Sequence, residues 1–426
     1  GAGLSGLATA TFLKELENDD VVVLEASGRV GGLARTDRRG DEGQYLFDVT
    51  GHWLHLRHPH IRDLVMGALG GQLLTVERKS GVYSHGIHTP YPFQANVHGL
   101  PPAVVKECLL GFIEAQIEAA AKPQDDEDAA PRHFGEYIQR HFGAGIAKHF
   151  MIPYNTRLWG VRPDEITAEW CGRFIPRPGL EEVIDGALGL KAHTLGYNAS
   201  FVYPVEGGVE TLSRALAAPV MAHIRLDSPV VSIDPAERRL RYRNPEGTRE
   251  LRYERLVSSI PLPRLVELFE PSEPALAGAA ARLRATRLRY LNVAIRVAAP
   301  EGKPLQGKHW IYIPEERWPF YRLGCFSNAV PYMAPEGQAT LYVELSNLLD
   351  ESWDEARVLD SLVEFLRETG DIDDASDIMF HELCEIPVAY VIFDHDYYDA
   401  TQTIHEALGE RRIHSIGRYG RWIYNS

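Results

Sequence analysis

The chain opens with Gly1-Ala2-Gly3-Leu4-Ser5-Gly6, a Gly-x-Gly-x-x-Gly pattern, and residues 7–13 are small or apolar, which predicts a helix. Glycines at this spacing permit a tight turn and let the backbone approach a phosphate group at the N-terminus of that helix. Val21-Val22-Val23-Leu24 predicts a short strand buried on both faces, as in a parallel sheet. Glu25 ends this strand 19 positions after Gly6, where a carboxylate accepts hydrogen bonds from ribose hydroxyls. The stretch therefore predicts a dinucleotide-binding unit whose first strand would precede Gly1.

The residues that follow favour FAD over NAD as the dinucleotide. After Glu25 the sequence continues Ala-Ser-Gly-Arg-Val-Gly-Gly-Leu-Ala-Arg-Thr, so the glycine pair Gly31-Gly32 lies between Arg29 and Arg35. A second glycine turn and two guanidinium groups can reach the same pyrophosphate, and arginine offers a bidentate contact that lysine cannot. The alternative is a surface loop in which the two arginines are incidental.

Composition limits the partners and the compartment. The chain has 426 residues, 45% of them hydrophobic, which corresponds to two or three structural units. Its net charge of −15 argues against a nucleic-acid partner, and an anionic small ligand would need a local arginine cluster. No apolar run approaches the roughly 18–20 residues that span a bilayer, so we expect no integral membrane segment and a cytoplasmic protein.

No metal site is expected from the sequence. The four cysteines are widely spaced without a Cys-x-x-Cys pair, which indicates reduced thiols and neither a disulfide framework nor a thiolate site. His55, His58 and His60 lie close together, but their spacing fits no zinc motif and no carboxylate or thiolate completes it.

The order of predicted elements indicates an α/β protein with a discontinuous Rossmann-type FAD-binding domain. Residues 59–185 are largely helical in periodicity, residues 224–260 and 290–346 are strand-rich, and residues 353–369 predict a helix. We expect the FAD-binding domain to comprise residues 1–58, 200–262 and 405–426. Residues 59–199 would form a largely helical insertion, and residues 263–404 a substrate domain built on a mixed β-sheet.

The first 36 residues resemble the amine-oxidase and protoporphyrinogen-oxidase superfamily of flavoproteins, and this resemblance implies FAD. In that superfamily a strand such as Ser228-Pro229-Val230-Val231-Ser232 places its backbone against the adenine, which assigns Val231 to the cofactor site. A late glycine-arginine pair, here Gly417-Arg418, lies against the flavin.

Further short segments, in family order over nearly the whole chain, resemble one branch, the UDP-galactopyranose mutases, particularly the eukaryotic type. These segments are Gly51-His52-Trp53, Tyr91-Pro92-Phe93-Gln94, Pro319-Phe320-Tyr321-Arg322, Phe393-Asp394-His395 and residues 153–159, 196–201, 310–315, 326–328 and 417–424. The resemblance implies interconversion of the pyranose and furanose forms of a UDP-sugar through N5 of reduced FAD, with no net redox change. It also implies NAD(P)H as the reductant and a small nucleotide-sugar as the binding partner.

The resemblance carries roles over to individual residues. Arg322 matches an arginine that binds the diphosphate, and Tyr312, Tyr397 and Tyr424 match tyrosines that bond it. Gly51 and His52 match a loop beside flavin N5, and Arg78 matches an arginine that meets the NAD(P)H. The substrate-binding matches are Tyr91, Phe93 and Gln94 for the uridine, and Asn155, Trp159 and Asn198 for the diphosphate and sugar. A second diphosphate arginine is expected near Trp170, and either Arg173 or Arg177 could fill that place.

Two other readings of the same residues stay open. An oxidase or desaturase of the protoporphyrinogen-oxidase or amine-oxidase type would use the same FAD scaffold for hydride abstraction, and a flavoprotein that only binds is a third class. A tyrosine is more often a packing residue than a ligand, and Arg322 after two aromatic residues could form a structural ion pair or cation–π contact. The sugar, the nucleotide, the preference for NADH or NADPH, and the oligomeric state are not specified by these residues.

Overall fold

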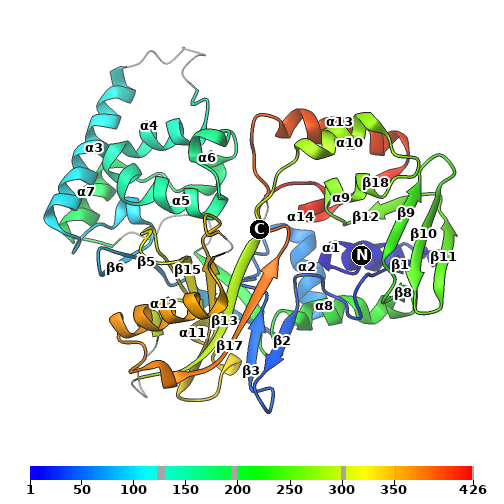
Figure 1. Cartoon of the computed structure of the whole chain (residues 1–426), viewed down its shortest axis with the longest axis horizontal. Coiled ribbons are helices and arrows are strands. Elements are labelled where there is room, and N and C mark those ends of the chain that lie inside the picture. The colour runs from blue at the N-terminus through cyan, green and yellow to red at the C-terminus, as the bar shows by residue number, and fades with distance from the viewer. Residues whose placement is uncertain (122–129, 193–198, 299–303, 351, 425–426) are drawn as a thin grey trace.

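A computed structural model gives the fold of the protein and describes residues 1–121, 130–192, 199–298, 304–350 and 352–424, without the side chain of Arg173. The opening motif forms the predicted helix α1 (Leu4–Glu15), and the predicted strand forms β1 (Val23–Leu24). β1 pairs in parallel with β8 (Ile224–Arg225), and β12 (Leu256–Ser258) pairs in parallel with β18 (Ile413–Ser415). Segments from the beginning, the middle and the end of the chain therefore contribute to these pairs, on the right of Figure 1.

Further elements surround these parallel strands. An antiparallel meander lies beside them, with strand order β11-β10-β9. The elements of this part are β2 (Thr36–Arg39), β3 (Tyr45–Asp48), α2 (Pro59–Ala68), β4 (Leu73–Glu77), β7 (Ser200–Pro204), α8 (Glu210–Ala217), β9 (Val230–Asp234), β10 (Arg239–Asn244), β11 (Gly247–Arg252), α9 (Leu262–Glu267), α10 (Pro274–Arg282), α13 (Tyr397–Glu410) and α14 (Gly417–Gly420).

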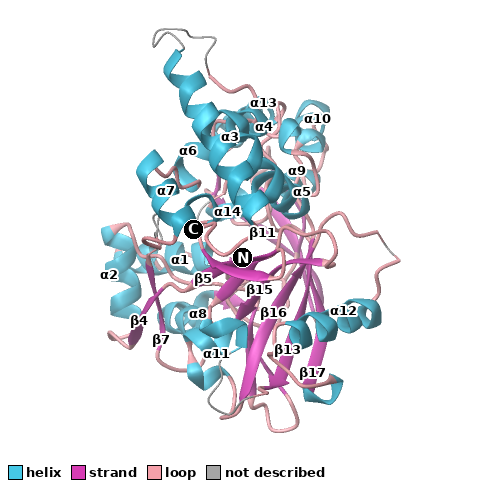
Figure 2. Ribbon diagram, turned by 90° about the vertical axis from the view of Figure 1, so that its left-hand side faces the viewer, coloured by secondary structure: helices cyan, strands magenta, loops and turns pink. Residues whose placement is uncertain are grey.

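A second region is built on a seven-stranded mixed sheet of order β17-β13-β16-β15-β14-β5-β6. Its strands are β5 (Ser80–Ser84), β6 (Ile87–Pro90), β13 (Leu288–Arg296), β14 (Trp310–Tyr312), β15 (Phe320–Cys325), β16 (Gln338–Leu345) and β17 (Ile378–Ile386). The short helix α11 (Phe326–Ala329) lies between β15 and β16 in the chain. The helix α12 (Glu355–Glu368) lies beside β13, β16 and β17 in Figure 2. Val358, Leu362 and Phe365 recur at helical spacing on its buried face, so they cover one face of the sheet.

The third region is helical and lies at the upper left of Figure 1. It contains α3 (Pro102–Ala121), α4 (Phe134–Ile146), α5 (Ile152–Trp159), α6 (Cys171–Phe174) and α7 (Leu180–Leu188). α3 and α4 can approach closely because Gly145 has no Cβ. A Cβ there would lie only 2.1 Å from the carbonyl oxygen of Glu107. Strands β5 and β6 fall within residues 59–199, the predicted helical insertion, but they join the large sheet. The domain boundaries stay a prediction.

Within the described ranges, no helix combines the length and the apolar character needed to cross a lipid bilayer.

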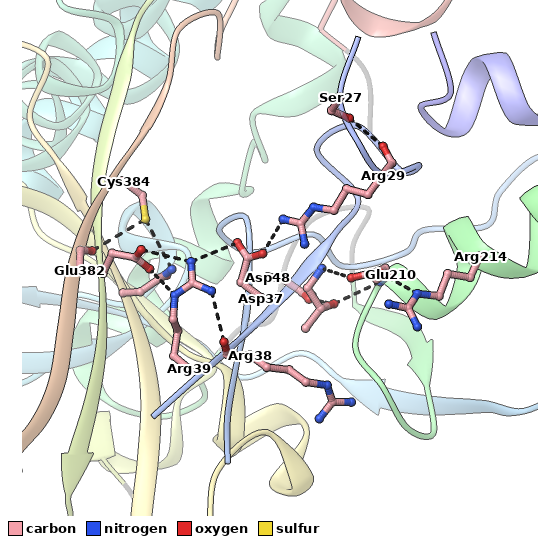
Figure 3. Close-up of polar contacts among 12 residues, drawn as sticks. Ser27, Arg29, Asp37, Arg38, Arg39, Asp48, Glu210, Arg214, Glu382 and Cys384 are labelled. Carbon is pink, nitrogen blue, oxygen red and sulfur yellow. Dashed lines mark hydrogen bonds and ion pairs between the residues drawn. The ribbon is translucent and has the colours of Figure 1, made fainter. Parts of the chain in front are cut away.

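A chain of ion pairs joins the second glycine turn to the large sheet. Arg29 pairs with Asp37 on β2, Arg39 Nη2 lies 3.9 Å from Asp37 Oδ2, and Arg39 Nε lies 2.8 Å from Glu382 Oε2 on β17 (Figure 3). The side chains involved are 17–42% exposed. Such partly solvated pairs orient the two parts more than they stabilise them.

A buried carboxylate joins three elements beside this chain. Asp48, at the end of β3, is 1% exposed. Its oxygens accept hydrogen bonds from the Thr36 hydroxyl at 2.6 Å, from the Tyr203 hydroxyl and from the Val209 amide at 3.3 Å. Burial raises the pKa of Asp48 to about 7, and the hydrogen bonds only partly offset that effect. The protonated carboxyl is therefore the form that the fold favours.

This elevated pKa makes stability depend on pH. A carboxyl whose pKa is higher in the folded state than in the unfolded state loses stability as pH rises through the interval between the two values. For Asp48 that interval runs from about 4 to about 7, and about three pKa units correspond to up to about 4 kcal/mol. We expect Asp48→Asn, which stays neutral, to flatten the decline of the unfolding free energy over this pH range, measured by urea denaturation. An equally steep decline in the variant would show that other groups cause it.

Candidate functional site

Three glycine segments form a cradle at the N-terminus of α1. Gly3 bridges to Gly31 in parallel fashion, and the Gly31 amide donates to the Ala2 carbonyl at 2.8 Å. Gly31 has a φ of +111°, and a Cβ there would lie 2.7 Å from the Ala34 carbonyl oxygen, so only glycine fits. Gly417, from the end of the chain, packs against Ser5. The cradle therefore offers bare backbone beside a helix N-terminus, which suits a diphosphate.

Glu25 lies beside this cradle. Its Oε2 accepts from the Ala2 amide at 2.7 Å, and its Oε1 accepts from the amide and hydroxyl of Ser27 at 2.9 Å. Glu25 also lines the cavity, where its oxygens have capacity for further hydrogen bonds. The Nε of Arg35 is buried and has no hydrogen-bond partner among the described residues.

A cavity of about 1910 Å³ runs from the cradle to the large sheet, and part of it extends between β1 and β12. Eighteen of the residues predicted from the sequence line it. They are Gly1, Gly3, Gly6, Glu25, Gly31, Gly32, Gly51, His52, Arg78, Tyr91, Gln94, Asn155, Trp159, Tyr312, Arg322, Gly417, Arg418 and Tyr424. The fold thus brings the two predicted halves of the site, cofactor and substrate, to one continuous space.

Arg322 forms the charged centre on the sheet side. Its strand β15 pairs with β16 so that Arg322 stands opposite Glu344, and Arg322 Nη2 lies 2.5 Å from Glu344 Oε1. The other carboxylate oxygen accepts from the Tyr321 hydroxyl at 2.7 Å. Glu344 is fully buried, whereas 21% of the Arg322 side chain is exposed. Because Arg322 lines the cavity, it can meet a ligand while Glu344 cannot.

The electrostatics keep Arg322 cationic and leave it capacity for a ligand. Burial is the largest single effect and acts to lower the pKa of Arg322. Glu344 and the surrounding tyrosine hydroxyls together outweigh it, so the pKa lies well above its ordinary value. Nη2 also donates to the Tyr390 hydroxyl at 2.9 Å, while the buried Nε has no partner within the described part of the chain. A permanent cation with an unused donor is suited to an anionic group.

Aromatic rings form the walls around Arg322. The rings of Tyr91 and Tyr312 lie 4.8 Å apart, and Arg78 lies over the Tyr91 ring at 5.4 Å. On the opposite side, the Arg418 guanidinium lies 4.6 Å from the centre of the Tyr424 ring and 5.5 Å from that of Tyr390. The cavity therefore combines flat apolar faces with phenol hydroxyls and cations, which suits a ligand that carries both a ring and an anionic group.

His52 is half-buried and lines the cavity near Arg418 and Arg322. Burial, together with the nearby charges of Arg418 and Arg322, lowers its pKa to about 4, so the imidazole is neutral at pH 7. The preceding Thr50 has a φ of +59°, and a Cβ on Gly51 would lie 2.6 Å from the Tyr342 hydroxyl oxygen. The loop is thus tightly held in a conformation that requires glycine at position 51.

Five predicted site residues do not line the cavity. The Tyr397 hydroxyl donates to the Trp422 carbonyl at 2.6 Å, so Tyr397 lies outside the candidate site. Phe93 is buried and stacks on Phe150 at 5.0 Å, behind the wall. The other three are Arg29, Arg35 and Val231. Arg29 pairs with Asp37. Arg35 and Val231 do not line the cavity, but the residues before them, Ala34 and Val230, do. Asn198 and the side chain of Arg173 lie outside the described residues, and Arg177 donates to the Tyr137 hydroxyl at 2.9 Å.

The structure adds residues that the sequence motifs did not reveal. Tyr390, seven positions before Tyr397, contacts Arg322 and lines the cavity. Tyr154, Tyr342 and Trp310 also line the cavity. Glu344 supports Arg322 from a strand 22 positions later. The alternation of β16, with Tyr342 and Glu344 on one face, is the only sequence signal that could have paired Glu344 with the site.

Comparison with known proteins places this architecture. Residues 4–407 match the family model described as flavin containing amine oxidoreductase. The chain belongs to this family. Its fold is similar to a crystal structure of reduced UDP-galactopyranose mutase, with a TM-score of 0.88 and 25% identity over 100% of this chain and 88% of that chain.

Other members share the fold at lower identity. A putative protoporphyrinogen oxidase from Exiguobacterium sp. 255-15 gives a TM-score of 0.68 with 16% identity, covering 97% of this chain and 91% of that one. Cyclohexylamine oxidase from Brevibacterium oxydans IH-35A gives 0.60 with 19% identity, covering 92% and 86%. The family implies a flavin, and the glycine cradle and Glu25, which line the cavity, are groups that fit FAD. Within the described ranges, no group of three or more His, Cys, Asp or Glu side chains could hold a metal ion.

The cradle leads to a prediction about cofactor retention. We expect Glu25→Ala to lose flavin on purification, because its carboxylate both fixes the Ala2 amide and faces the cavity. The measurement is the ratio of flavin to protein absorbance after gel filtration. A variant that keeps a full complement of FAD would contradict the role given to Glu25.

A second prediction concerns the support of Arg322. Glu344→Ala leaves a largely buried cation without its counter-charge, so we expect the unfolding free energy to fall by about 3 kcal/mol. The matched control is Glu364→Ala, whose ion pair with Arg317 is exposed and should contribute less than about 1 kcal/mol. Both values come from chemical denaturation of the flavin-loaded protein. Equal losses in the two variants would show that Glu344 does not compensate a buried charge.

Proposed function

We propose that the chain is a flavin-dependent sugar-nucleotide mutase that interconverts the pyranose and furanose forms of a UDP-sugar, of the UDP-galactopyranose type. The observation that carries this proposal is Arg322, a compensated cation with an unused Nε donor, which shares one cavity with the glycine cradle. The similarity to a reduced UDP-galactopyranose mutase over the whole chain supports the same reading.

The leaving group of such a reaction is a diphosphate, and the sheet side of the cavity can hold one. Arg322 would bind the phosphate oxygens through Nε, and the hydroxyls of Tyr312, Tyr390 and Tyr424 would add neutral donors. Burial raises the pKa of Tyr312 and Tyr390, so both phenols stay protonated and able to donate. Fixed donors aimed at a developing negative charge stabilise its departure.

The uridine can lie against the helical side of the same cavity. Gln94 is 2% exposed, and its Nε2 donates to the Pro176 carbonyl at 2.8 Å. Its Oε1 has no partner among the described residues, so it can accept a hydrogen bond from the base. Tyr91 offers a ring face beside it, and Asn155 and Trp159 on α5 line the space that leads toward the sugar.

When bound, reduced FAD would supply a nucleophilic nitrogen for attack on the anomeric carbon of the sugar, with UDP as the leaving group. His52 is neutral at pH 7, so positive charge at the diphosphate would come from arginine rather than from this imidazole. Arg78, at the Tyr91 wall, is the residue we propose to meet NAD(P)H. The aromatic walls exclude water from the reacting atoms.

The proposal predicts UDP binding that depends on Arg322. We expect Arg322→Ala to weaken UDP binding by about 2–5 kcal/mol in calorimetric titration of the flavin-loaded protein. Arg322→Lys, which keeps the charge beside Glu344 but not the fork, guards against misfolding and should bind more weakly than the wild type. Arg317→Ala, an exposed arginine near α12, is the matched control and should bind UDP normally.

The outcomes separate the proposal from its competitor. A wild-type protein that does not bind UDP, or an Arg322→Ala variant with unchanged affinity, would contradict the mutase assignment. Steady release of H₂O₂ on exposure to an amine or an apolar substrate would instead indicate an oxidase on the same scaffold.

A further inference from the structure

Arg157 on α5 is a buried cation whose partners are backbone carbonyls. It is 2% exposed and does not line the cavity. Its Nη1 donates to the carbonyls of Ile313 at 3.0 Å and Glu315 at 2.6 Å, and its Nη2 donates to those of Trp318 and, at 2.8 Å, Phe320. Burying a guanidinium is costly unless its donors are satisfied, so an arginine held in this way has a specific structural task.

Three of the four carbonyls belong to the loop that joins β14 to β15, and the fourth is that of Phe320, the first residue of β15. Ile313 directly follows Tyr312, and Phe320 precedes Arg322 by two positions. The guanidinium therefore donates hydrogen bonds to both ends of the loop, one end close to Tyr312 and the other close to Arg322. Because the guanidinium is planar and rigid, its two nitrogens fix the separation of the two ends.

The helix that supplies Arg157 also forms the facing wall of the cavity. Asn155 and Trp159 flank Arg157 in sequence and line the cavity. The C-terminal end of α5 is held to the sheet by Asn347, whose amide donates to the Arg157 carbonyl at 3.0 Å and whose Nδ2 donates to the Leu158 carbonyl at 2.7 Å. Arg157 thus joins the helical wall to the wall that carries Tyr312 and Arg322.

We propose that Arg157 is a positioning residue that sets the distance between these two walls, and that it thereby tunes the affinity for the diphosphate without touching it. This inference rests on the proposed function, since the ligand through which it is measured is the nucleotide diphosphate. Lysine keeps the charge at this position but donates from a single nitrogen, so it cannot hold the carbonyls of both ends of the loop in the same geometry.

The test is a double-mutant cycle on UDP affinity with the flavin-loaded protein. We expect Arg157→Lys to raise the dissociation constant for UDP about tenfold while the flavin spectrum and circular dichroism stay unchanged. The loss should shrink in an Arg322→Lys background, because residues that act through one another are not additive. Val358→Ala, on the buried face of α12, controls for lost stability and should leave UDP affinity unchanged.

The contrary results are equally specific. Arg157→Lys with wild-type UDP affinity, or losses that add in full with those of Arg322→Lys, would overturn the positioning role. If Arg157→Lys does not fold, Asn347→Ala, which releases the Leu158 carbonyl from the same junction, should weaken UDP binding about threefold, and unchanged affinity would overturn the inference.

A ligand-free measurement separates this inference from the proposed function. If the wild type binds no UDP, the proposed function fails, and hydrogen exchange of residues 313–320 decides the role of Arg157. Faster exchange there in Arg157→Lys than in Val358→Ala supports the clamp. Equal exchange in the two variants overturns it.

Discussion

The candidate site depends on the compensation of one buried cation. Arg322 can face the cavity only because Glu344 stands opposite it on the neighbouring strand and supplies the counter-charge from full burial. That pairing is a property of strand register, since a shift of one residue would turn Glu344 to the other face of the sheet. The seven-stranded sheet, which packs against α12, therefore holds Arg322 and Glu344 opposite each other. The aromatic walls and the phenol hydroxyls are arranged around this point.

The same cavity is closed by parts that lie far apart in the sequence. The cradle takes Gly3 and Gly31 from the start of the chain and Gly417 from its end, while α5 contributes the wall with Asn155 and Trp159. Relatives with the same fold and less than 25% identity include oxidases, so the scaffold alone does not specify a reaction. In this chain the wall that faces the cradle carries a cation, Arg322, and several tyrosines.

The sequence predicted the elements that local patterns encode. The Gly-x-Gly-x-x-Gly helix, the strand before Glu25 and the helix around Leu362 are present, since each depends on periodicity and turn residues within a few positions. Tertiary contacts were harder to foresee. Motif order favoured Tyr397, but the chain path places Tyr390 beside Arg322 and directs Tyr397 to the Trp422 carbonyl. Asp48 and Arg157 carried no signal, because their partners include backbone groups supplied by remote segments.

We propose that reduced flavin and the Arg322 wall together isomerise a UDP-sugar. The most direct measurement is an anaerobic assay in which the dithionite-reduced, FAD-loaded protein is mixed separately with UDP-galactopyranose and UDP-galactofuranose, and the two are resolved by chromatography. The account predicts interconversion by the reduced protein and none by the oxidised protein. A reduced protein that binds neither UDP nor these sugars, and leaves both unchanged, would contradict it.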